Sequence, residues 1–235
     1  MSFSMRDPGW TPRGAVSARD EGLRAFFVGT YARMGLALAV SAAAALVVAS
    51  SPALLAAIFG TPLRWVVMLA PLAMALLLGP VMARSTPEGA TGWLLVFAAV
   101  MGVTLSSLLV AYTGESVVRA LLVTACTFGG ASLYGYTTGA DLSRAGGILV
   151  MAVIGLVVAG LVNLFLQSSG LQFALSAIAV LVFTGLAAWD TQRLKLLYLQ
   201  GAGDPGQLAA FGALSLYLDT VNLFVARLGL TGERR

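Results

Sequence analysis

Histidine is absent from the 235 residues, cysteine occurs once, and charged residues make up only 10% of the chain. A typical soluble domain is about a quarter charged, so this composition excludes an ordinary water-soluble globule. Without histidine and with one cysteine, the chain cannot form a His/Cys zinc site, a Ser-His-Asp triad or an intrachain disulfide. We therefore expect no enzymatic activity and no resident cofactor.

What the chain has in abundance is apolar sequence, with 59% hydrophobic residues and a mean hydropathy of +0.91. Seven spanning helices of about 20 residues use roughly 140 residues, which leaves enough for short loops and tails. A β-barrel would instead show strands of about ten residues with alternating polarity. The sequence predicts an all-α polytopic membrane protein with a bundle of seven transmembrane helices. The expected spans are residues 25–49, 65–82, 93–112, 117–133, 145–166, 171–189 and 207–230.

The ends and loops predict the topology. Residues 1–24 mix charges of both signs with prolines and are expected to form a mobile cytoplasmic tail, ahead of a transmembrane domain over residues 25–230 and a short C-terminal tail over residues 231–235. Nine of the 14 basic residues fall on the side of the N-terminus and five on the other, which predicts a cytoplasmic N-terminus. Seven spans then place the C-terminus outside. If one of the segments is re-entrant instead of spanning, the C-terminus lies in the cytoplasm.

The expected partners follow from the same distribution of charge. The basic residues are scattered over loops instead of lining one face, so we expect a lipid bilayer and no nucleic acid as partner. The composition favours a bacterial inner membrane. Small residues four apart, Gly135 with Gly139 and Gly155 with Ala159, predict two places where helices approach closely.

Charged side chains in or beside the spans carry most of the functional information, because in lipid they face the protein interior or water. Asp219 lies eleven to twelve residues into the last span, and Ser215 and Asn222 share its helical face with small residues. This stripe is expected to face the interior and to line a site. Asp190 ends the sixth span and Arg84 the second. Each also has an interpretation without a functional role. Asp190 would be a surface carboxylate paired with Arg193, and Arg84 would be a basic residue that only sets the topology.

Two carboxylates that meet in a low-dielectric core cannot both ionise cheaply, so the pair would hold one proton. Asp190 and Asp219 are the candidates, and such a pair can titrate near neutral pH in a chain without histidine. Arg84 beside the pair would favour its ionised form. Loss of the proton leaves an oxygen site suited to a hard cation such as Ca²⁺, so protons and Ca²⁺ would compete for it.

Two strings carry a family resemblance: FTGLAAWDTQR at residues 183–193 and GALSLYLDTVNLF at residues 212–224. They are similar to the signature of the Bax-inhibitor (transmembrane Bax inhibitor motif) family, in its bacterial branch. The resemblance implies a seven-helix protein that conducts a slow Ca²⁺ leak, gated by a pair of aspartates with a partner arginine at the end of the second helix. By motif the aspartates are Asp190 and Asp219, and by position the arginine is Arg84. Some relatives carry an acidic residue about three turns earlier, where residues 69–73 are all apolar here.

Other classes of membrane protein fit less well. Residues 201–204 read Gly-Ala-Gly-Asp, like an intramembrane aspartyl protease, but Pro205 follows and indicates a turn. A rhomboid-type protease needs a histidine, and a retinal protein needs a lysine in its last span, where this chain has none. A non-conducting regulator that binds other membrane proteins stays open as the alternative to a pH-sensitive Ca²⁺ leak channel.

Overall fold

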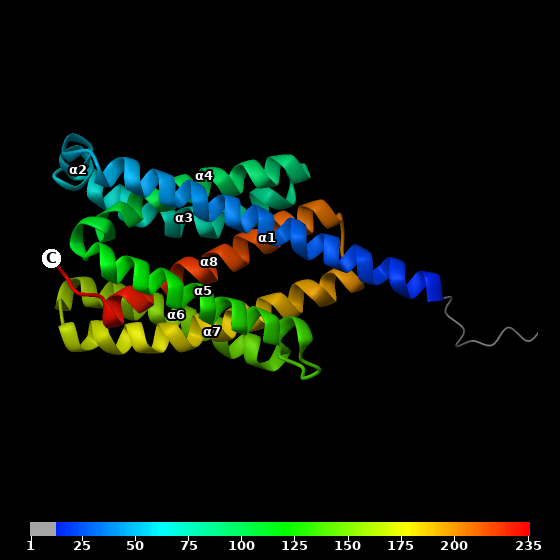
Figure 1. Cartoon of the computed structure of the whole chain (residues 1–235). Coiled ribbons are helices and arrows are strands. Elements are labelled where there is room, and N and C mark those ends of the chain that lie inside the picture. Colours follow the sequence, from blue (N-terminus) through cyan, green and yellow to red (C-terminus); the bar gives the residue numbers. More distant parts are fainter. Residues whose placement is uncertain (1–12) are drawn as a thin grey trace, which may run out of the picture.

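The structure is a computed structural model that describes residues 13–235, with side chains from residue 19 onward. The described part forms eight helices and no strand. Seven of the helices are long and apolar enough to cross a membrane, and the remaining one, α2, is only eight residues long. The predicted all-α fold with seven membrane helices is therefore confirmed (Figure 1). The helices are α1 (Arg13–Ala49), α2 (Pro52–Phe59), α3 (Leu63–Ala83), α4 (Pro87–Ala111), α5 (Gly114–Thr137), α6 (Ser143–Leu166), α7 (Ser169–Leu199) and α8 (Pro205–Thr231).

The last helix, α8, runs through the middle of the bundle. In Figure 1 it passes between α1, α3 and α4 on one side and α5, α6 and α7 on the other. In an 18-residue apolar stretch of α8, 61% of the residues are buried inside the protein. The corresponding share for α6 is 6%, because α6 lies at the periphery and packs chiefly on α7. A helix that is covered on all sides can carry polar groups away from lipid, so α8 is the place where a buried charge is tolerated.

Small residues let neighbouring helices approach α8. Ala209, Ala210 and Ala213 are buried along it, and a Cβ atom at Gly212 would lie only 2.7 Å from the Leu194 side chain of α7. Lipid tails are as apolar as leucine, so membrane helices associate through such close packing.

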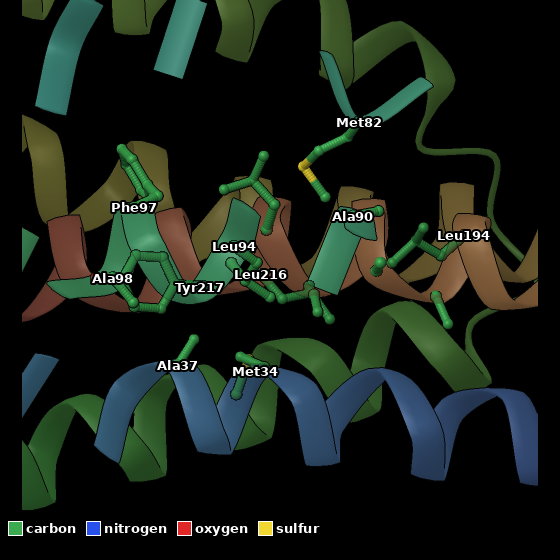
Figure 2. Packing of buried hydrophobic residues seen from close by; sticks show 14 of the residues in the cluster. Met34, Ala37, Met82, Ala90, Leu94, Phe97, Ala98, Leu194, Leu216 and Tyr217 are labelled. Atoms are coloured by element: carbon green, nitrogen blue, oxygen red, sulfur yellow. The ribbon is translucent and has the colours of Figure 1, made fainter. Parts of the chain in front are cut away.

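Large side chains fill the spaces between the approaching helices (Figure 2). Met34 of α1, Met82 of α3 and Leu94 of α4 meet Leu216 and Tyr217 of α8 in one buried cluster. The Tyr217 ring also meets the ring of Phe97 edge-on, with 5.8 Å between centroids. Such aromatic pairs add about 0.5–1.5 kcal/mol beyond the area they bury.

Of the two close helix approaches predicted from small residues, the structure shows one at Gly135 and none at Gly155. A Cβ atom at Gly135 would lie 2.0 Å from the carbonyl oxygen of Ala188, so α5 and α7 touch there through their backbones. At Gly139 and Gly155 the space beside the backbone is open. The prediction at Gly155 and Ala159 is wrong because α6 contacts α7 through other residues: Gly146 near its start faces the Trp189 ring, and Asn163 near its end bonds Gln172.

The first helix begins at Arg13, well before the predicted Ala25, so the second half of the predicted tail is helical. The cause is packing against the end of α7. Phe26 stacks on Tyr198 with ring centroids 4.8 Å apart, and Arg19 donates a hydrogen bond to the carbonyl of Leu199 at 2.8 Å. The expectation of a mobile tail over residues 1–12 lies outside the described residues.

The connection between α7 and α8 is a tight loop. Gly201 and Gly203 take left-handed φ angles of +68° and +86°, which other residues rarely adopt. Asp204 then caps α8, because its carboxylate accepts a hydrogen bond from the backbone N–H of Gln207 at 2.9 Å. The Gly-Ala-Gly-Asp string is thus a turn and a helix cap, as its proline predicted. The Gln207 side-chain amide donates to carbonyls at the end of α3, those of Met82, Ala83 and Ser85.

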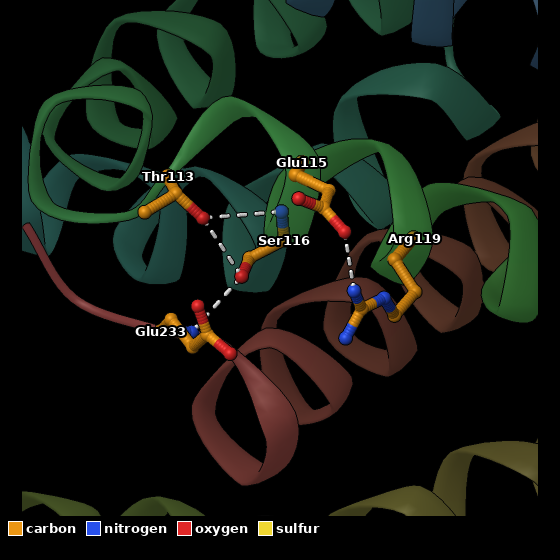
Figure 3. A network of polar contacts seen from close by, with 5 residues as sticks. All are labelled: Thr113, Glu115, Ser116, Arg119 and Glu233. Atoms are coloured by element: carbon orange, nitrogen blue, oxygen red, sulfur yellow. Dashed lines mark hydrogen bonds and ion pairs between the residues drawn. The ribbon is translucent and has the colours of Figure 1, made fainter.

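The C-terminal residues pair with the loop between α4 and α5 (Figure 3). The Glu233 N–H donates to Ser116 Oγ at 3.0 Å, and the Glu233 carbonyl accepts from the Thr113 N–H at 3.0 Å. Nearby, Arg119 and Glu115 form an exposed ion pair at 2.6 Å, one helical turn apart. The predicted tail over residues 231–235 is therefore fixed at the end of the bundle opposite the start of α1.

Candidate functional site

Asp190 and Asp219 are both buried, on α7 and α8, which pack against each other along their length. Asp219 is 4% exposed and lies near the centre of α8. Asp190 is 8% exposed and lies nine residues before the end of α7 at Leu199, about 14 Å along the axis at 1.5 Å per residue. The sequence placed Asp190 at the end of the span, but α7 continues past it, so the side chain lies inside the bundle.

The two carboxyl groups are buried on helices that pack against each other. Ionised carboxylates only accept hydrogen bonds, so a bond between the two groups would need a proton on one of them. In the described part of the chain, Asp219 Oδ2 is buried and receives no hydrogen bond from any donor. Buried polar atoms are rarely left without a partner, so this oxygen marks the place where a proton or an ion would be held.

The arginine nearest to Asp190 in the sequence is Arg193, three residues or about one turn later on α7. The Arg193 guanidinium lies over the Trp189 ring at 5.2 Å from its centroid. Cation–π contact of this kind fixes the direction of an arginine side chain.

Arg84 is not brought to the pair in this structure. It caps the C-terminal end of α3, is exposed, and makes no ion pair or side-chain hydrogen bond within residues 19–235. Ser215 is half-buried on α8, and the Asn222 side chain donates to the carbonyl of Leu218 on its own helix at 2.9 Å. Ser215 and Asn222 share the helix of Asp219 but make no hydrogen bond to either carboxyl in the part that the structure describes.

A chain of hydroxyls beside Asp190 was not predicted from the sequence. Thr191, the next residue on α7, hydrogen-bonds Ser132 of α5 at 2.9 Å, and Ser132 in turn bonds the hydroxyl of Tyr31 on α1. Ser132 and Thr191 are buried and Tyr31 is half-buried. The signal available in the sequence was the presence of hydroxyl residues inside apolar spans. Their partners could not be predicted, because each bond joins residues 59 or more positions apart.

A second polar contact flanks Asp219. Tyr217, two residues earlier on α8, bonds the hydroxyl of Ser41 on α1 at 2.7 Å, and Ser41 bonds the carbonyl of Ala98 on α4 at 2.7 Å. The two carboxyls thus lie in a polar layer that connects α1, α4, α5, α7 and α8.

The pair alone offers few ligands for a metal ion. Ca²⁺ takes six to eight oxygen ligands, and two carboxylates supply at most four oxygens. No group of three or more metal-binding side chains occurs among the described residues. A cation at Asp190 and Asp219 would have to complete its shell with backbone carbonyls, hydroxyls or water.

One titratable group in the loops is well defined. The Asp141 carboxylate accepts a hydrogen bond from the Ser143 backbone N–H at 2.9 Å, before the start of α6. This bond, the Ser143 hydroxyl and the charge of Arg144 lower the pKa of Asp141 below its usual value. Asp141 therefore stays ionised through the neutral range and does not sense pH there.

The fold and the buried groups define a polytopic α-helical membrane protein with one buried carboxyl group on each of its last two helices. Residues 23–235 match the family described as "Inhibitor of apoptosis-promoting Bax1", and the chain belongs to this Bax inhibitor family. The resemblance seen in the two motif strings is thereby confirmed.

Several bacterial proteins are similar over nearly their whole length. The inner membrane protein YbhL of Escherichia coli strain K12 is 38% identical over 219 residues, which cover 91% of this chain and 94% of YbhL. An uncharacterized protein of Caulobacter vibrioides is 45% identical over 230 residues, covering 92% and 91%. One of Rickettsia prowazekii is 41% identical over 218 residues, covering 92% of each. Together with its seven apolar helices, this identifies the chain as an integral membrane protein.

Proposed function

We propose that this protein is a pH-sensitive leak channel for Ca²⁺ in a bacterial inner membrane, with its N-terminus in the cytoplasm. The observation that carries the proposal is that Asp190 and Asp219 are both buried on two helices that pack against each other, and that Asp219 Oδ2 has no hydrogen-bond partner among the described residues. Charged groups in a membrane interior are costly and mark ion or proton paths. The inner-membrane relative in Escherichia coli supports the location.

The proposed gate follows from the charge of the pair. With one proton, the two carboxyls attract each other and hold α7 against α8. Without it, two unit charges about 4 Å apart repel by about 4 kcal/mol at an effective dielectric constant of about 20. That repulsion is relieved when the helices shift or when a cation enters between them. Because α8 contacts most of the other helices, a small shift of α8 changes packing throughout the bundle.

The proposed gate includes an arginine partner, and two residues are candidates for it. Arg84 is the residue that the family resemblance indicates, whereas Arg193 lies about one turn after Asp190 on α7. The role of Arg84 requires α3 to move its C-terminal end toward the pair. Gln207 of α8 holds that end through three carbonyls, so motion of α8 would carry the end of α3 with it.

A second candidate is a non-conducting regulator that binds other membrane proteins. It is favoured by the solid packing around α8, where Phe97 and Tyr217 are completely buried and fill the centre of the bundle. The two candidates differ in whether the purified chain alone transports an ion.

The test is Ca²⁺ flux into proteoliposomes that contain only this protein, with the pH stepped between 5 and 8. Flux that changes with pH in the wild type, and loses that dependence in Asp219→Asn, would support the channel. Glu115→Gln is a matched control, because Glu115 is an exposed carboxylate in a surface ion pair. No flux at any pH from correctly folded protein would exclude the channel and leave the regulator.

A further inference from the structure

A cavity of about 460 Å³ opens between α1 and α5, and neither Asp190 nor Asp219 lines it. Residues of α1, α4, α5 and α8 line it, and almost all of them are aliphatic or aromatic. Pockets of this volume are large enough for a small organic ligand. The cavity has no role in the gate proposed above, and what fills it is a separate question.

The cavity exists because α1 and α5 touch at only one end. Near the start of α1, Phe27 contacts the Tyr136 ring edge-on at 5.1 Å, and Tyr31 bonds Ser132. Toward the other end, α1 packs on α4 and α8 while α5 packs on α7 and α8. The space between the two helices is left open there.

The mouth of the cavity belongs to the lipid-facing surface of the protein. Leu46 of α1 is 62% exposed and Leu121 of α5 is 50% exposed, and both line the opening. Deeper inside, Val117 and Phe224 are 9% and 8% exposed. The lining is thus continuous from the outer surface of two membrane helices to the buried face of α8.

The depth of the cavity matches one leaflet of a bilayer. Its lining covers residues 38–46 of α1 and residues 117–125 of α5, eight residue steps or about 12 Å along each helix. The hydrocarbon core of a bilayer is about 30 Å thick, so each leaflet contributes about 15 Å. The cavity lies in the half of the bundle that contains the end of α1 and the start of α5.

We propose that an acyl chain of a membrane phospholipid from that leaflet occupies the cavity between α1 and α5. An opening at this depth is in contact with lipid tails, and its apolar walls offer a polar ligand almost no hydrogen bond. The inner wall includes Thr220 and Val221, the two residues after Asp219, so the acyl chain touches the helix that carries the buried carboxyl. The site does not depend on whether the protein conducts ions.

One hydroxyl distinguishes a lipid-filled cavity from a wet one. Thr124 lines the inner end, is 2% exposed, and its Oγ1 has no hydrogen-bond partner among the described residues. Water in the cavity would supply that partner. Beside an acyl chain, the Thr124 hydroxyl has no such partner. It would instead rotate about χ1 and donate a hydrogen bond to a backbone carbonyl of its own helix.

The first experiment is photocrosslinking in liposomes made with a phospholipid that carries a diazirine in one acyl chain. After irradiation and digestion, mass spectrometry maps the labelled residues. Labelling at the buried Val117 and Phe224, besides exposed positions such as Leu133, is the expected result. Labelling confined to exposed positions would overturn the proposal.

Two adjacent residues of α1 give a matched pair of variants. Ala42 and Ala43 are both exposed, but only Ala42 lines the cavity. Ala42→Phe places a ring in the cavity and should reduce labelling of Phe224 to background, whereas Ala43→Phe should leave it at the wild-type level. Leu133 should be labelled equally in all three proteins, which shows that the variants fold and insert. Equal labelling of Phe224 in both variants contradicts the proposal.

The second experiment tests for water. Ala125 lines the cavity and is exposed, so a thiol there reports what fills it. Ala125→Cys in a Cys126→Ser background is treated with a charged thiol reagent, and Thr61→Cys, in an exposed loop, is the positive control. The expected result is modification at position 61 and none at position 125. Modification at position 125 as fast as at position 61 would show an aqueous cavity and would overturn the lipid site.

Discussion

The Tyr217 hydroxyl on α8 lies 2.7 Å from the Ser41 hydroxyl on α1, and these side chains are 0% and 3% exposed. Ser41 has one proton, and two carbonyl oxygens lie within reach of its hydroxyl, that of Ala98 on α4 at 2.7 Å and that of Ala37 on α1 at 3.1 Å. Because a carbonyl can only accept, we assign the Ser41 proton to the shorter bond with Ala98, and Tyr217 as the donor to Ser41. Three helices are joined by two hydrogen bonds, two residues before Asp219.

This arrangement predicts unequal effects for its two partners. Ser41→Ala leaves the buried Tyr217 hydroxyl without a partner and should destabilise the fold by about 1–3 kcal/mol. Tyr217→Phe leaves Ser41 bonded to Ala98 and should cost only about 1 kcal/mol. Thermal unfolding midpoints in detergent measure both. Thr127→Ala, which removes an exposed bond within α5, is the control and should change little. The reverse order of Ser41→Ala and Tyr217→Phe would contradict the assignment of donors.

A second prediction concerns the pH response of Ca²⁺ flux. If the pair of Asp190 and Asp219 is the sensor, wild-type flux should change over about one to two pH units between roughly pH 5 and 8. Asp190→Asn and Asp219→Asn each remove one charge and should flatten that response. The double variant should add little to either single one, because the two residues act as a unit.

Flux measured across the pH range in the four proteins gives the answer. Additive single effects would indicate two independent sites. An unchanged midpoint and steepness in both single variants would place the sensor elsewhere. Asp141→Asn is the loop control: the depressed pKa of Asp141 keeps it ionised throughout this range, so its removal should leave the midpoint unchanged.

A third prediction separates the two arginines. Removing a cation that stabilises the ionised pair makes ionisation harder, so the flux midpoint should move to higher pH. If Arg84 reaches the pair in the closed form, Arg84→Ala should cause this shift. If Arg193, one turn after Asp190 on α7, has that role, Arg193→Ala should cause it instead. A midpoint that is the same in wild type and Arg84→Ala would reduce Arg84 to a topology anchor.

A fourth prediction tests helix contact through glycine. Gly135→Ala places a Cβ atom against the carbonyl oxygen of Ala188 and must push α5 away from α7. Overpacking of this kind costs about 1–3 kcal/mol, which a lower unfolding midpoint in detergent would show. Gly155→Ala, where the space is open, should be neutral or slightly stabilising, because alanine favours a helix. Equal loss of stability in both variants would mean that contact at Gly135 does not matter.

The sequence by itself determined the class of protein and most of its helices. Long apolar runs predicted all seven spans, because a lipid core admits only helices with internally satisfied backbones. The predicted bounds of four of them, α3, α5, α6 and α8, lie within four residues of the observed ends, whereas α4 begins six residues earlier and α7 ends ten residues later than predicted. The sequence also selected Asp219, since a carboxylate in mid-span must face protein. The pattern missed the early start of α1 at Arg13, because charges near the N-terminus hide an apolar face that packs on α7.

Only the tertiary structure decided which polar groups meet. That α8 lies at the centre of the bundle, that Asp190 is enclosed instead of lying at a surface, and that Arg84 stays exposed all depend on contacts between helices distant in sequence. The same is true of the bonds from Ser41 to Tyr217 and from Ser132 to Thr191. Hydropathy depends on each residue and its neighbours along the chain, whereas these contacts depend on the positions and rotations of whole helices, which packing alone fixes.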